Sequence, residues 1–369
     1  MWIHEHRKWP AFLWNAKKLT SKLANIRHHQ GRLLGRMEGL GFALQREANL
    51  STLTNDVVMS SAIEGENLNP EEVRSSIARR LGIDIAGMRP AGRHVDGMVE
   101  MMLDATQKFT ELLTEKRLFD WHAALFPTGR SGMNPITVGG WRTIDSGLMQ
   151  VVSGPIGREK VHFEAPAADR LKQEMALFLN WFNAIDDIDL VLKSGIAHLW
   201  FVTIHPFEDG NGRIARAISD LTLARADGVS ERFYSLSTQI EFERKDYYRH
   251  LERQQGGTLE ITEWLVWFLD CLENALFNAE KSSEKVLYKS QLWDKINQHS
   301  VNKRQRLIIN RMLEDNFIGH INTSKYGKLA KCSSDTALRD IQELKNRGIL
   351  IQNPGGGRST SYRLKRVID

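Results

Sequence analysis

The stretch from residue 189 to residue 204 constrains the fold more than any other, because it is apolar almost all round. Its apolar side chains would cover every face of a helix rather than one stripe: Leu190, Val191, Leu192, Ile196, Leu199, Trp200, Phe201 and Val202. A helix of this composition is buried on all sides. We therefore expect an enclosed helix that brings His205 to its end.

Most of the chain up to about Gln298 is predicted to be helical, since apolar residues recur at spacings of three and four and proline is scarce. One helix has clear end signals. Asn69 can cap it, Pro70 suits its first turn, and Gly82 would end it after Leu81. The expected fold class is mainly α.

The stretch from Gly132 to Pro166 differs, because six glycines separate short β-prone runs. Two of these runs, 149–152 and 160–163, are joined by a Gly- and Pro-containing loop at 153–157. This pattern predicts a β-hairpin with a longer loop.

The segment 303–369 shows helical patterns near 303–313, 324–330 and 335–347, then β-prone runs at 349–351 and 361–364. This order resembles a winged helix-turn-helix. From Ser300 onward the chain has 14 Lys and Arg against 6 Asp and Glu, a net charge of +8 within a chain total of +5. Contact with DNA phosphates fits that charge, and so does a protein-docking or dimerisation module.

We predict four parts: an N-terminal helical region at 1–90, a catalytic core at 91–280, a linker or helix at 281–302, and the winged helix-turn-helix at 303–369. Cys271 and Cys332 stand far apart without metal-ligand spacing, which argues against a disulfide framework or a zinc site. The start of the chain has no secretory signal, and no run approaches the roughly 20 apolar residues of a membrane helix. We expect a cytoplasmic protein.

Directly after the enclosed helix comes the run His205-Pro206-Phe207-Glu208-Asp209-Gly210-Asn211-Gly212-Arg213. Two glycines around an asparagine let backbone N–H groups form a concave anion site. The helical pattern that follows places this site at a helix N-terminus, which favours negative charge. Arg213 and Arg216 share one face of that helix and can bind further phosphate oxygens.

Two further side chains of the run suit phosphate chemistry. The carboxylate of Asp209 is a suitable ligand for Mg²⁺ that also binds substrate phosphates. His205 can act as a general base near neutral pH. Together these residues predict transfer of a nucleotide phosphate group by positioning and electrostatics.

The nine residues also match the signature of the Fic (Fido) family, His-x-Phe-x-(Asp/Glu)-Gly-Asn-Gly-Arg, and Arg216 supplies the second arginine that follows it. The likeness covers roughly residues 118–255. It implies a protein adenylyltransferase that moves AMP from ATP to a Ser, Thr or Tyr hydroxyl of target proteins and of itself. In this likeness His205 is the base, Asp209 holds Mg²⁺, and Gly210, Asn211, Gly212 and Arg213 bind the phosphates, while Phe207 packs inward.

The resemblance extends to two segments that would approach the nucleotide. The Gly132 to Pro166 stretch resembles the family's β-hairpin flap, which pairs with the target's main chain. Its nucleotide-lining part is expected at Lys160, Val161, His162 and Phe163. The helix with Tyr247, Tyr248 and Gln255 resembles the family's adenosine-contacting segment, although paired tyrosines on a helix are also typical of partly buried packing residues.

Upstream, Ser60 and Glu64 lie four apart on the last turns of a predicted helix that Gly65 would end. A glutamate there faces the negative end of the helix dipole and needs a partner. The spacing Ser-x-x-x-Glu-Gly matches the inhibitory motif of Fic proteins, which implies that Glu64 pairs with Arg216 and silences transfer. A surface glutamate at a frayed helix end is the alternative reading.

Other functions remain open at the sequence level. The chain could be a DNA-binding regulator whose nucleotide pocket senses ATP, it could transfer UMP or another phosphate-containing group, or it could hydrolyse a phosphoanhydride with water. The family resemblance also implies a homodimer. The target protein is not indicated by any residue of the chain.

Overall fold

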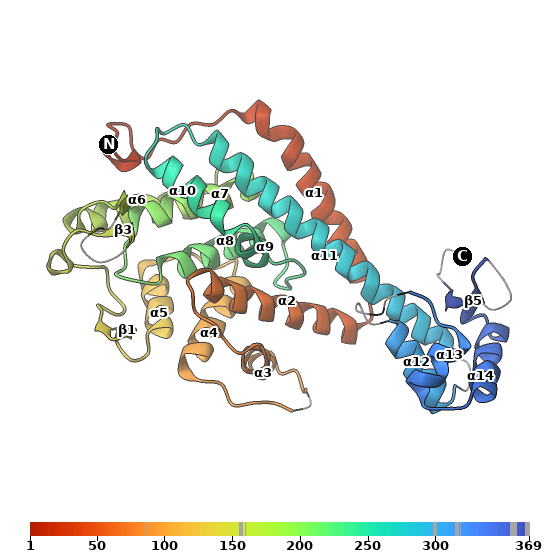
Figure 1. Cartoon of the computed structure of the whole chain (residues 1–369). Helices are drawn as coiled ribbons and strands as arrows, with labels where there is room; N and C mark the ends of the chain where they lie inside the picture. Colours follow the sequence, from red (N-terminus) through yellow and green to blue (C-terminus); the bar gives the residue numbers. More distant parts are fainter. Residues whose placement is uncertain are drawn as a thin grey trace. The chain divides into compact units, whose positions relative to one another are not determined.

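The computed structural model describes residues 1–85, 87–154, 158, 160–297, 301–313, 317, 319–354 and 360–365. The chain divides into two compact units, Met1–Ala279 and Glu280–Asp369. The first unit is built from helices (Figure 1). Their bounds are α1 Ala16–Glu38, α2 Phe42–Ile63, α3 Pro70–Arg80, α4 Arg93–Gln107, α5 Glu115–Leu125, α6 Leu171–Asn183, α7 Leu190–Ile204, α8 Asn211–Asp227, α9 Leu236–Phe242 and α10 Arg244–Gln255, and α11 Thr262–Asn297 begins in it.

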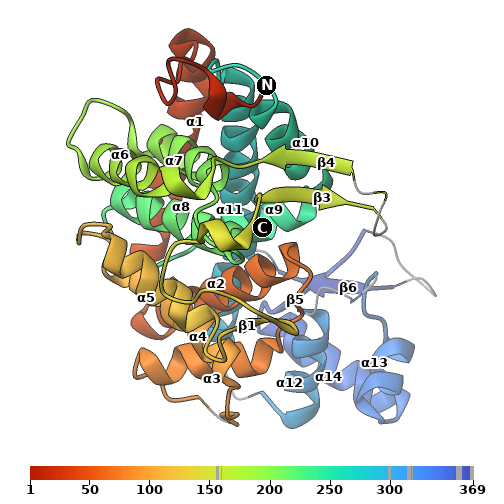
Figure 2. The same ribbon diagram turned by 90° about the vertical axis from the view of Figure 1, so that its left-hand side faces the viewer.

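Helix α7 is the enclosed helix that the sequence predicts. Every residue from Val191 to Ile204 is buried. Helix α8 packs along α7, and α4, α5 and α2 also contact α8. The mainly α fold class is confirmed, and α7 and α8 form the layer that carries the 205–216 segment (Figure 2).

Local signals in the sequence explain where the helices start and stop. The side chain of Asn69 accepts a hydrogen bond from the backbone N–H of Glu71 at 2.9 Å, and Asp189 accepts one from Val191 at 2.8 Å. Gly82 follows α3 with φ of 65°, in the left-handed region that favours glycine. The predicted helix at 69–81 is confirmed, with Leu81 as its C-terminal cap.

The predicted β-hairpin is confirmed in β3 (Gln150–Ser153) and β4 (Lys160–Glu164), which pair antiparallel with an irregularity between Val151 and Val152. We call residues 150–164 the flap hairpin. Of its predicted loop at 153–157, residues 155–157 lie outside the described residues. A shorter hairpin, β1 (Arg130–Ser131) with β2 (Asn134–Pro135), had no clear sequence signal. Short 3₁₀ helices occur at η1 Ile3–Glu5, η2 Ile144–Ser146 and η3 Ala168–Arg170.

The polar segment expected to link domains is helical, because α11 continues to Asn297. The second unit contains the last part of α11, then α12 (Lys303–Met312), α13 (Thr323–Ala330), α14 (Ser334–Asn346) and the antiparallel pair β5 (Leu350–Gln352) and β6 (Tyr362–Leu364). Ile321 forms a β-bridge to Tyr362. The helices and strands lie where the sequence pattern places them, while the tip of the predicted wing, Gly355–Arg358, lies outside the described residues.

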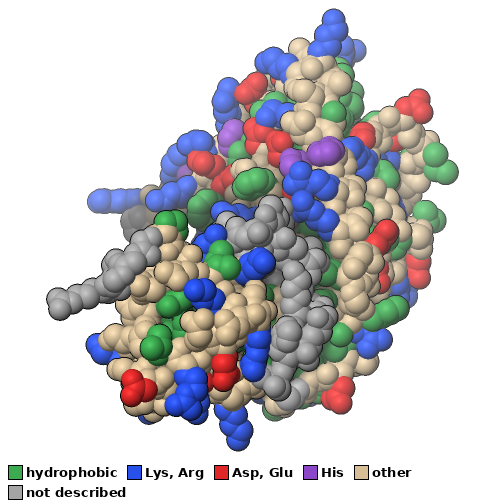
Figure 3. Space-filling model, turned by 90° about the vertical axis from the view of Figure 1, so that its right-hand side faces the viewer, with side chains coloured by type: hydrophobic (Ala, Val, Ile, Leu, Met, Phe, Trp, Pro, Cys, Tyr) green, Lys and Arg blue, Asp and Glu red, His purple; other side chains and the backbone are tan. Residues whose placement is uncertain are grey.

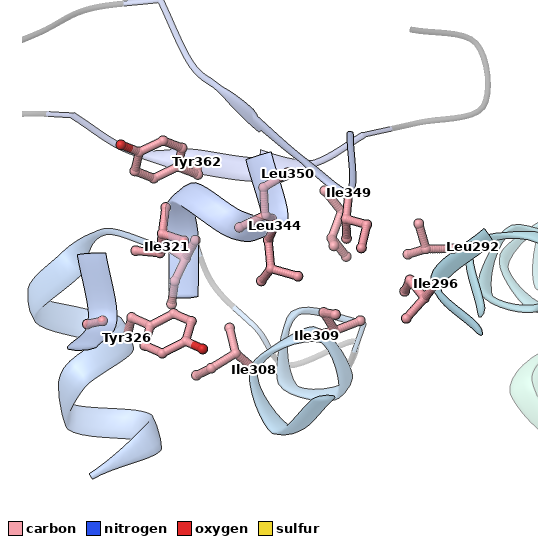
Figure 4. Close-up of a cluster of buried hydrophobic side chains, with 13 residues drawn as sticks. Leu292, Ile296, Ile308, Ile309, Ile321, Tyr326, Leu344, Ile349, Leu350 and Tyr362 are labelled. Carbon is pink, nitrogen blue, oxygen red and sulfur yellow. The ribbon is translucent and has the colours of Figure 1, made fainter. Parts of the chain in front are cut away.

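This second unit has a hydrophobic core of its own. Leu292 and Ile296 of α11 contribute to it, as do Ile309 of α12 and Leu344 of α14, and all four are buried (Figure 4). On the face of the molecule drawn in Figure 3, Lys and Arg side chains are interspersed with hydrophobic and acidic ones. Within the described residues, no helix is both long enough and apolar enough to cross a membrane.

Candidate active site

His205 stands at the junction between α7 and the loop to α8. It has φ of 50°, and its backbone N–H donates to the carbonyl of Phe201 at 3.0 Å, which closes the last turn of α7. A residue with a side chain is strained in the left-handed region, and such strain concentrates at functional sites. The ring Nδ1 donates to the carbonyl of Val202 at 3.2 Å, so the proton sits on Nδ1 and Nε2 keeps its lone pair.

The surroundings keep His205 uncharged. Burial lowers the pKa of His205 to about 4, the bond to Val202 opposes this, and the charge of Arg142 lowers it further. Arg142 also donates from Nε to the carbonyl of His205 at 2.9 Å, while its backbone N–H donates to Pro206 at 2.9 Å. Arg142 therefore fixes the strained turn, although nothing in the sequence pattern indicated it.

The loop between the two helices is held from inside. Asn211 Oδ1 accepts from the backbone N–H of Phe207 at 3.0 Å, and Asn211 Nδ2 donates to the carbonyl of Phe207 at 2.8 Å. The resemblance assigns this side chain to the phosphates, but here both of its polar ends bind the loop. The ring of Phe207 is fully buried, as expected.

His122 of α5 completes this support and was missed from sequence. Its ring stacks on Phe207 with centroids 4.2 Å apart and planes 7° from parallel. Its Nε2 donates to the carbonyl of Asp209 at 3.2 Å, and its Nδ1 accepts from the backbone N–H of Gly139 at 3.2 Å. Burial lowers the pKa of His122 to about 4, so its neutral form makes both bonds.

The N-terminus of α8 lies where the glycines predict an anion site. Gly210 has φ of 82° and caps the helix, which begins at Asn211. Asp209 lies beside it, partly exposed, and accepts hydrogen bonds from the hydroxyl of Ser131 and from the backbone N–H of Gly210. Unpaired N–H groups and the helix dipole make this end of α8 attractive to a phosphate or a carboxylate.

A carboxylate of the chain itself occupies this end. Glu64, at the C-terminal cap of α2, accepts a hydrogen bond from Arg216 Nη2 at 2.8 Å. Ser60 joins the contact: its Oγ accepts from Arg216 Nε at 2.8 Å, and its carbonyl accepts from Nη2 at 2.8 Å. A Cβ at residue 212 would collide with Oε1 of Glu64, so the carboxylate fits only because Gly212 is glycine.

Both arginines of the site keep a nitrogen for a further partner. Arg213 is 3% exposed and Arg216 is 1% exposed. Arg213 Nε and Arg216 Nη1 are buried and have no hydrogen-bond partner among the described residues. Because a buried donor without a partner is unfavourable, these two nitrogens are suited to oxygen atoms of a bound anion. Arg213 also pairs with Glu66 at 2.8 Å.

The four residues of β4 that the sequence analysis singles out have different surroundings. Lys160 and His162 reach Glu252 of α10 at 2.8 Å and 3.0 Å. Phe163 is 1% exposed and packs edge-on against the ring of Trp2 with centroids 5.5 Å apart, so it anchors the flap hairpin to the N-terminal segment. Val161 is 40% exposed. Strand alternation places Lys160 and His162 on one face of the strand and Val161 and Phe163 on the other, and contact of this segment with a nucleotide stays a prediction.

The residues expected at the adenosine site differ in exposure, and their contact with adenosine stays a prediction. Tyr247 is 2% exposed, and its hydroxyl lies 2.9 Å from Nε2 of the buried His198. Tyr248 is 40% exposed and donates its hydroxyl to the carbonyl of Ile63 at 3.1 Å, at the end of α2. Gln255 is buried, with Nε2 3.4 Å from the carbonyl of Val202. Of the three, Tyr248 is the one with an exposed surface.

Comparisons with known proteins agree with this geometry. Residues 112–223 match the family model described as Fic/DOC family, and residues 2–83 match a domain of unknown function, DUF4172. The chain is 26% identical over 242 residues to a protein adenylyltransferase Fic of Drosophila virilis, covering 63% of the chain and 43% of that protein. For the protein adenylyltransferase Fic of Culex quinquefasciatus the identity is 25%, with 66% and 44% covered. The chain thus spans less than half the length of these relatives.

The fold has a solved counterpart as well. A Fic family protein from Desulfovibrio desulfuricans G20 aligns with 93% of the chain and 96% of its own length, with a TM-score of 0.50 and 22% identity. Residues 112–223 therefore match the Fic/DOC family model, and the fold of the chain is shared with a solved Fic family protein.

Proposed function

We propose that the protein transfers AMP from ATP to a hydroxyl group of a target protein, and that Glu64 restrains this transfer. The observation that carries the proposal is the neutral His205, whose Nε2 has a free lone pair, in the loop that leads into the anion-binding start of α8. Relatives named protein adenylyltransferase support the choice of reaction.

In the proposed reaction a target Ser, Thr or Tyr oxygen attacks the α-phosphorus of ATP. The new oxygen–phosphorus bond forms as the bond to pyrophosphate breaks, and Nε2 of His205 accepts the hydroxyl proton. Backbone N–H groups at Asn211 and Gly212 and the free nitrogens of Arg213 and Arg216 hold phosphate oxygens. The strained turn at His205, fixed by Arg142, keeps the base in place.

Asp209 would hold Mg²⁺. Its carboxylate is partly exposed, and its protein contacts are a hydroxyl, a backbone N–H and Arg213 Nη2 at 3.6 Å, which leaves oxygen lone pairs for a cation. Mg²⁺ commonly binds through one or two carboxylates, with waters and substrate phosphates completing its shell. When bound, the ion would neutralise phosphate charge.

The contact of Glu64 with Arg216 supports restraint. A nucleotide phosphate and the Glu64 carboxylate would compete for the same arginine and the same helix end. While Glu64 is in place, Arg216 cannot direct Nη2 to a substrate. Opening the site requires α2 to shift or the carboxylate to rotate away.

The test compares ATP labelled at the α-phosphate with ATP labelled at the γ-phosphate. Glu64→Gly protein should acquire α label and no γ label, and Glu64→Gly/His205→Ala should acquire neither. Label from the γ-phosphate alone would replace the proposal with kinase chemistry. Unlabelled UTP that competes with the reaction as well as unlabelled ATP would point to another nucleotide as the substrate.

A second function, DNA binding, is favoured by the charges of the second unit. Two of its described acids are engaged, Asp340 by Arg304 at 2.8 Å and Glu343 by Arg347 at 3.7 Å. On α14, Arg339 and Lys345 are exposed, and Lys345 also donates to the side chain of Gln352 at 3.2 Å. We propose that the exposed surface of α14 contacts DNA, in the manner of a recognition helix.

Binding of the full chain to a labelled DNA duplex, followed by fluorescence anisotropy at several salt concentrations, tests this second proposal. Arg339→Glu with Lys345→Glu should weaken binding and flatten its salt dependence by about two charges. Lys17→Glu, an exposed charge reversal on α1, is the control. Absence of binding, or equal loss in the control, would contradict a DNA-contacting α14.

Homodimer formation stays a prediction.

A further inference from the structure

Helix α2 presents more than the Glu64 contact to the catalytic helix. Asp56, Ser60 and Glu64 are spaced four apart and therefore share one face of α2. Ser60 and Glu64 bind Arg216. Two turns before Glu64, Asp56 is fully buried and accepts a hydrogen bond from the hydroxyl of Ser235, in the segment that follows α8.

The surroundings of Asp56 contain more carboxyl groups than cations. Arg232 is fully buried and pairs with Asp220 at 3.2 Å and with Asp227 at 3.1 Å, both on α8. Asp56 receives the Ser235 hydroxyl rather than a direct hydrogen bond from the guanidinium. Arg232 therefore pairs with two carboxyl groups, and the third, Asp56, is bonded to a neutral hydroxyl in the same buried region.

Two carboxyl oxygens in this cluster lack a hydrogen-bond donor among the described residues. Asp56 Oδ2 and Asp220 Oδ2 are buried and have no hydrogen-bond partner among the described residues. An ionised carboxylate buried without a partner is strongly unfavourable, and a proton removes the excess charge. The geometry thus indicates that the cluster holds at least one proton.

The directions of the pKa shifts of Asp56 and Asp220 agree with a proton held in the cluster. Burial raises the pKa of Asp56 well above its usual value, and the carboxyl of Asp220 raises it further. Arg232, Ser235 and the backbone N–H of Ser237 oppose this rise. Burial also raises the pKa of Asp220 to about 6.

Charged and titratable groups near Asp56 come from several elements. Helix α8 contributes Asp220, Asp227 and Arg216, and the segment before α9 contributes Arg232 and Tyr234. Arg27 and Gln30 of α1 reach towards Asp227. On the other helices packed against α2, Arg74 of α3 pairs with Glu47 of α2, and Arg80 of α3 pairs with Asp96 of α4.

We propose that Asp56 is a positioning residue of the inhibitory helix, which docks against α8 in protonated form, so that docking takes up a proton and undocking releases it. This inference rests on the proposed restraint by Glu64. Asp56 acts through Glu64, since both lie on one rigid helix and Glu64 meets Arg216 only when α2 is seated.

The sign of the effect follows from linkage. The pKa of Asp56 is raised in the docked state. The extra stability that its proton gives to docking is therefore complete below the ordinary pKa of an aspartate and is lost as the pH rises through the raised pKa. Restraint should therefore be tight in mildly acidic solution and looser in alkaline solution. Loss of one bound proton changes the docking equilibrium by at most about tenfold per pH unit.

The experiment measures the rate of AMP transfer by wild-type protein and by Glu64→Gly from about pH 5.5 to about pH 8.5. The ratio of the Glu64→Gly rate to the wild-type rate cancels the pH dependence of the chemistry itself. We expect the ratio to fall several-fold as the pH rises. A ratio that stays constant with pH would overturn the proposal.

Asp56→Asn supplies the matched control, because an amide has the shape of the protonated acid and cannot ionise. Its rate should stay low at every pH, so that the ratio of Asp56→Asn/Glu64→Gly to Asp56→Asn is large and constant. If Asp56→Asn instead releases transfer, the charged carboxylate is what holds α2 and the proposal is wrong. Should this variant not fold, Asp220→Asn is used, and an unchanged pH slope in it would likewise refute a shared proton.

A readout without catalysis separates this inference from the proposed function. Amide hydrogen exchange of residues 42–63 is compared between wild type and Asp56→Asn at the same pH. In alkaline solution α2 should exchange faster in the wild type, and equal exchange at every pH would overturn the role of Asp56. If Glu64→Gly transfers no label, the function is refuted while exchange still decides the docking mechanism.

Discussion

Two buried arginines, one on α8 and one just beyond it, have opposite kinds of partner. Arg216 meets a single carboxylate, that of Glu64, whose side chain is 31% exposed and lies at the C-terminal cap of α2. Arg232 meets Asp220 and Asp227, which are 1% and 2% exposed and come from α8 itself. The first contact lies at the protein surface and can exchange its carboxylate for a phosphate, whereas the second joins groups that are all buried while α2 is seated. Helix α8 thus carries an exchangeable ion pair at Arg216 and, through Asp220 and Asp227, the buried ion pairs with Arg232.

Arg232→Met tests the buried ion pairs of Arg232 with Asp220 and Asp227, and it should have the largest effect. It leaves buried carboxylates without their cation, and the free energy of unfolding should fall by about 3–5 kcal/mol. Denaturant unfolding measures this loss. The matched change Arg216→Met should destabilise less, because Glu64 can turn to solvent, and equal losses would break the comparison.

Arg216→Met in the Glu64→Gly background tests the exchangeable contact. With the competing carboxylate gone, the change removes phosphate contacts, and transfer should fall by about 10²–10³-fold. Rates of labelling from α-labelled ATP provide the measurement. If the rate stays within a factor of two of the Glu64→Gly protein, Arg216 does not bind the nucleotide.

Glu64→Gln keeps the size of the side chain and removes its charge. A hydrogen bond to a charged group contributes about 1.5–3 kcal/mol, so weakening it should raise transfer by roughly 10- to 100-fold. Glu66→Gln is the control, since Glu66 pairs with Arg213 and its side chain is 48% exposed. An equal rise in both variants would show that any nearby loss of charge opens the site.

The smallest effect is expected from pH on the unrestrained enzyme. Since the pKa of His205 is lowered to about 4, its base form is already complete at neutral pH. The kcat/KM of Glu64→Gly should be nearly flat from about pH 6 to about pH 8 and should fall only as the pH drops towards 4. A midpoint near the ordinary histidine value would show that the site hydrates when α2 is displaced.

The sequence predicts features that depend on neighbouring residues and does not predict contacts between residues far apart in the chain. The caps of α3 and α7, the enclosed α7 and the strands of the flap hairpin follow from residues within a few positions of each other. Residues such as Arg142 and His122 have no such signal, because their partners at 205 and 209 lie 63 and 87 residues away. Strand alternation likewise divides the flap residues between two faces.

By itself the sequence determined the helical class and the chemical content of residues 205–216, since a nine-residue run contains base, carboxylate, glycines and arginine together. Only the tertiary structure decided how these groups are used. The packing of α2 on α8 brings Glu64 to Arg216 across 152 residues and seats Asp56 near Asp220 and Arg232. Periodicity and capping are local, whereas the partner of a buried charge is set by which helices share a core.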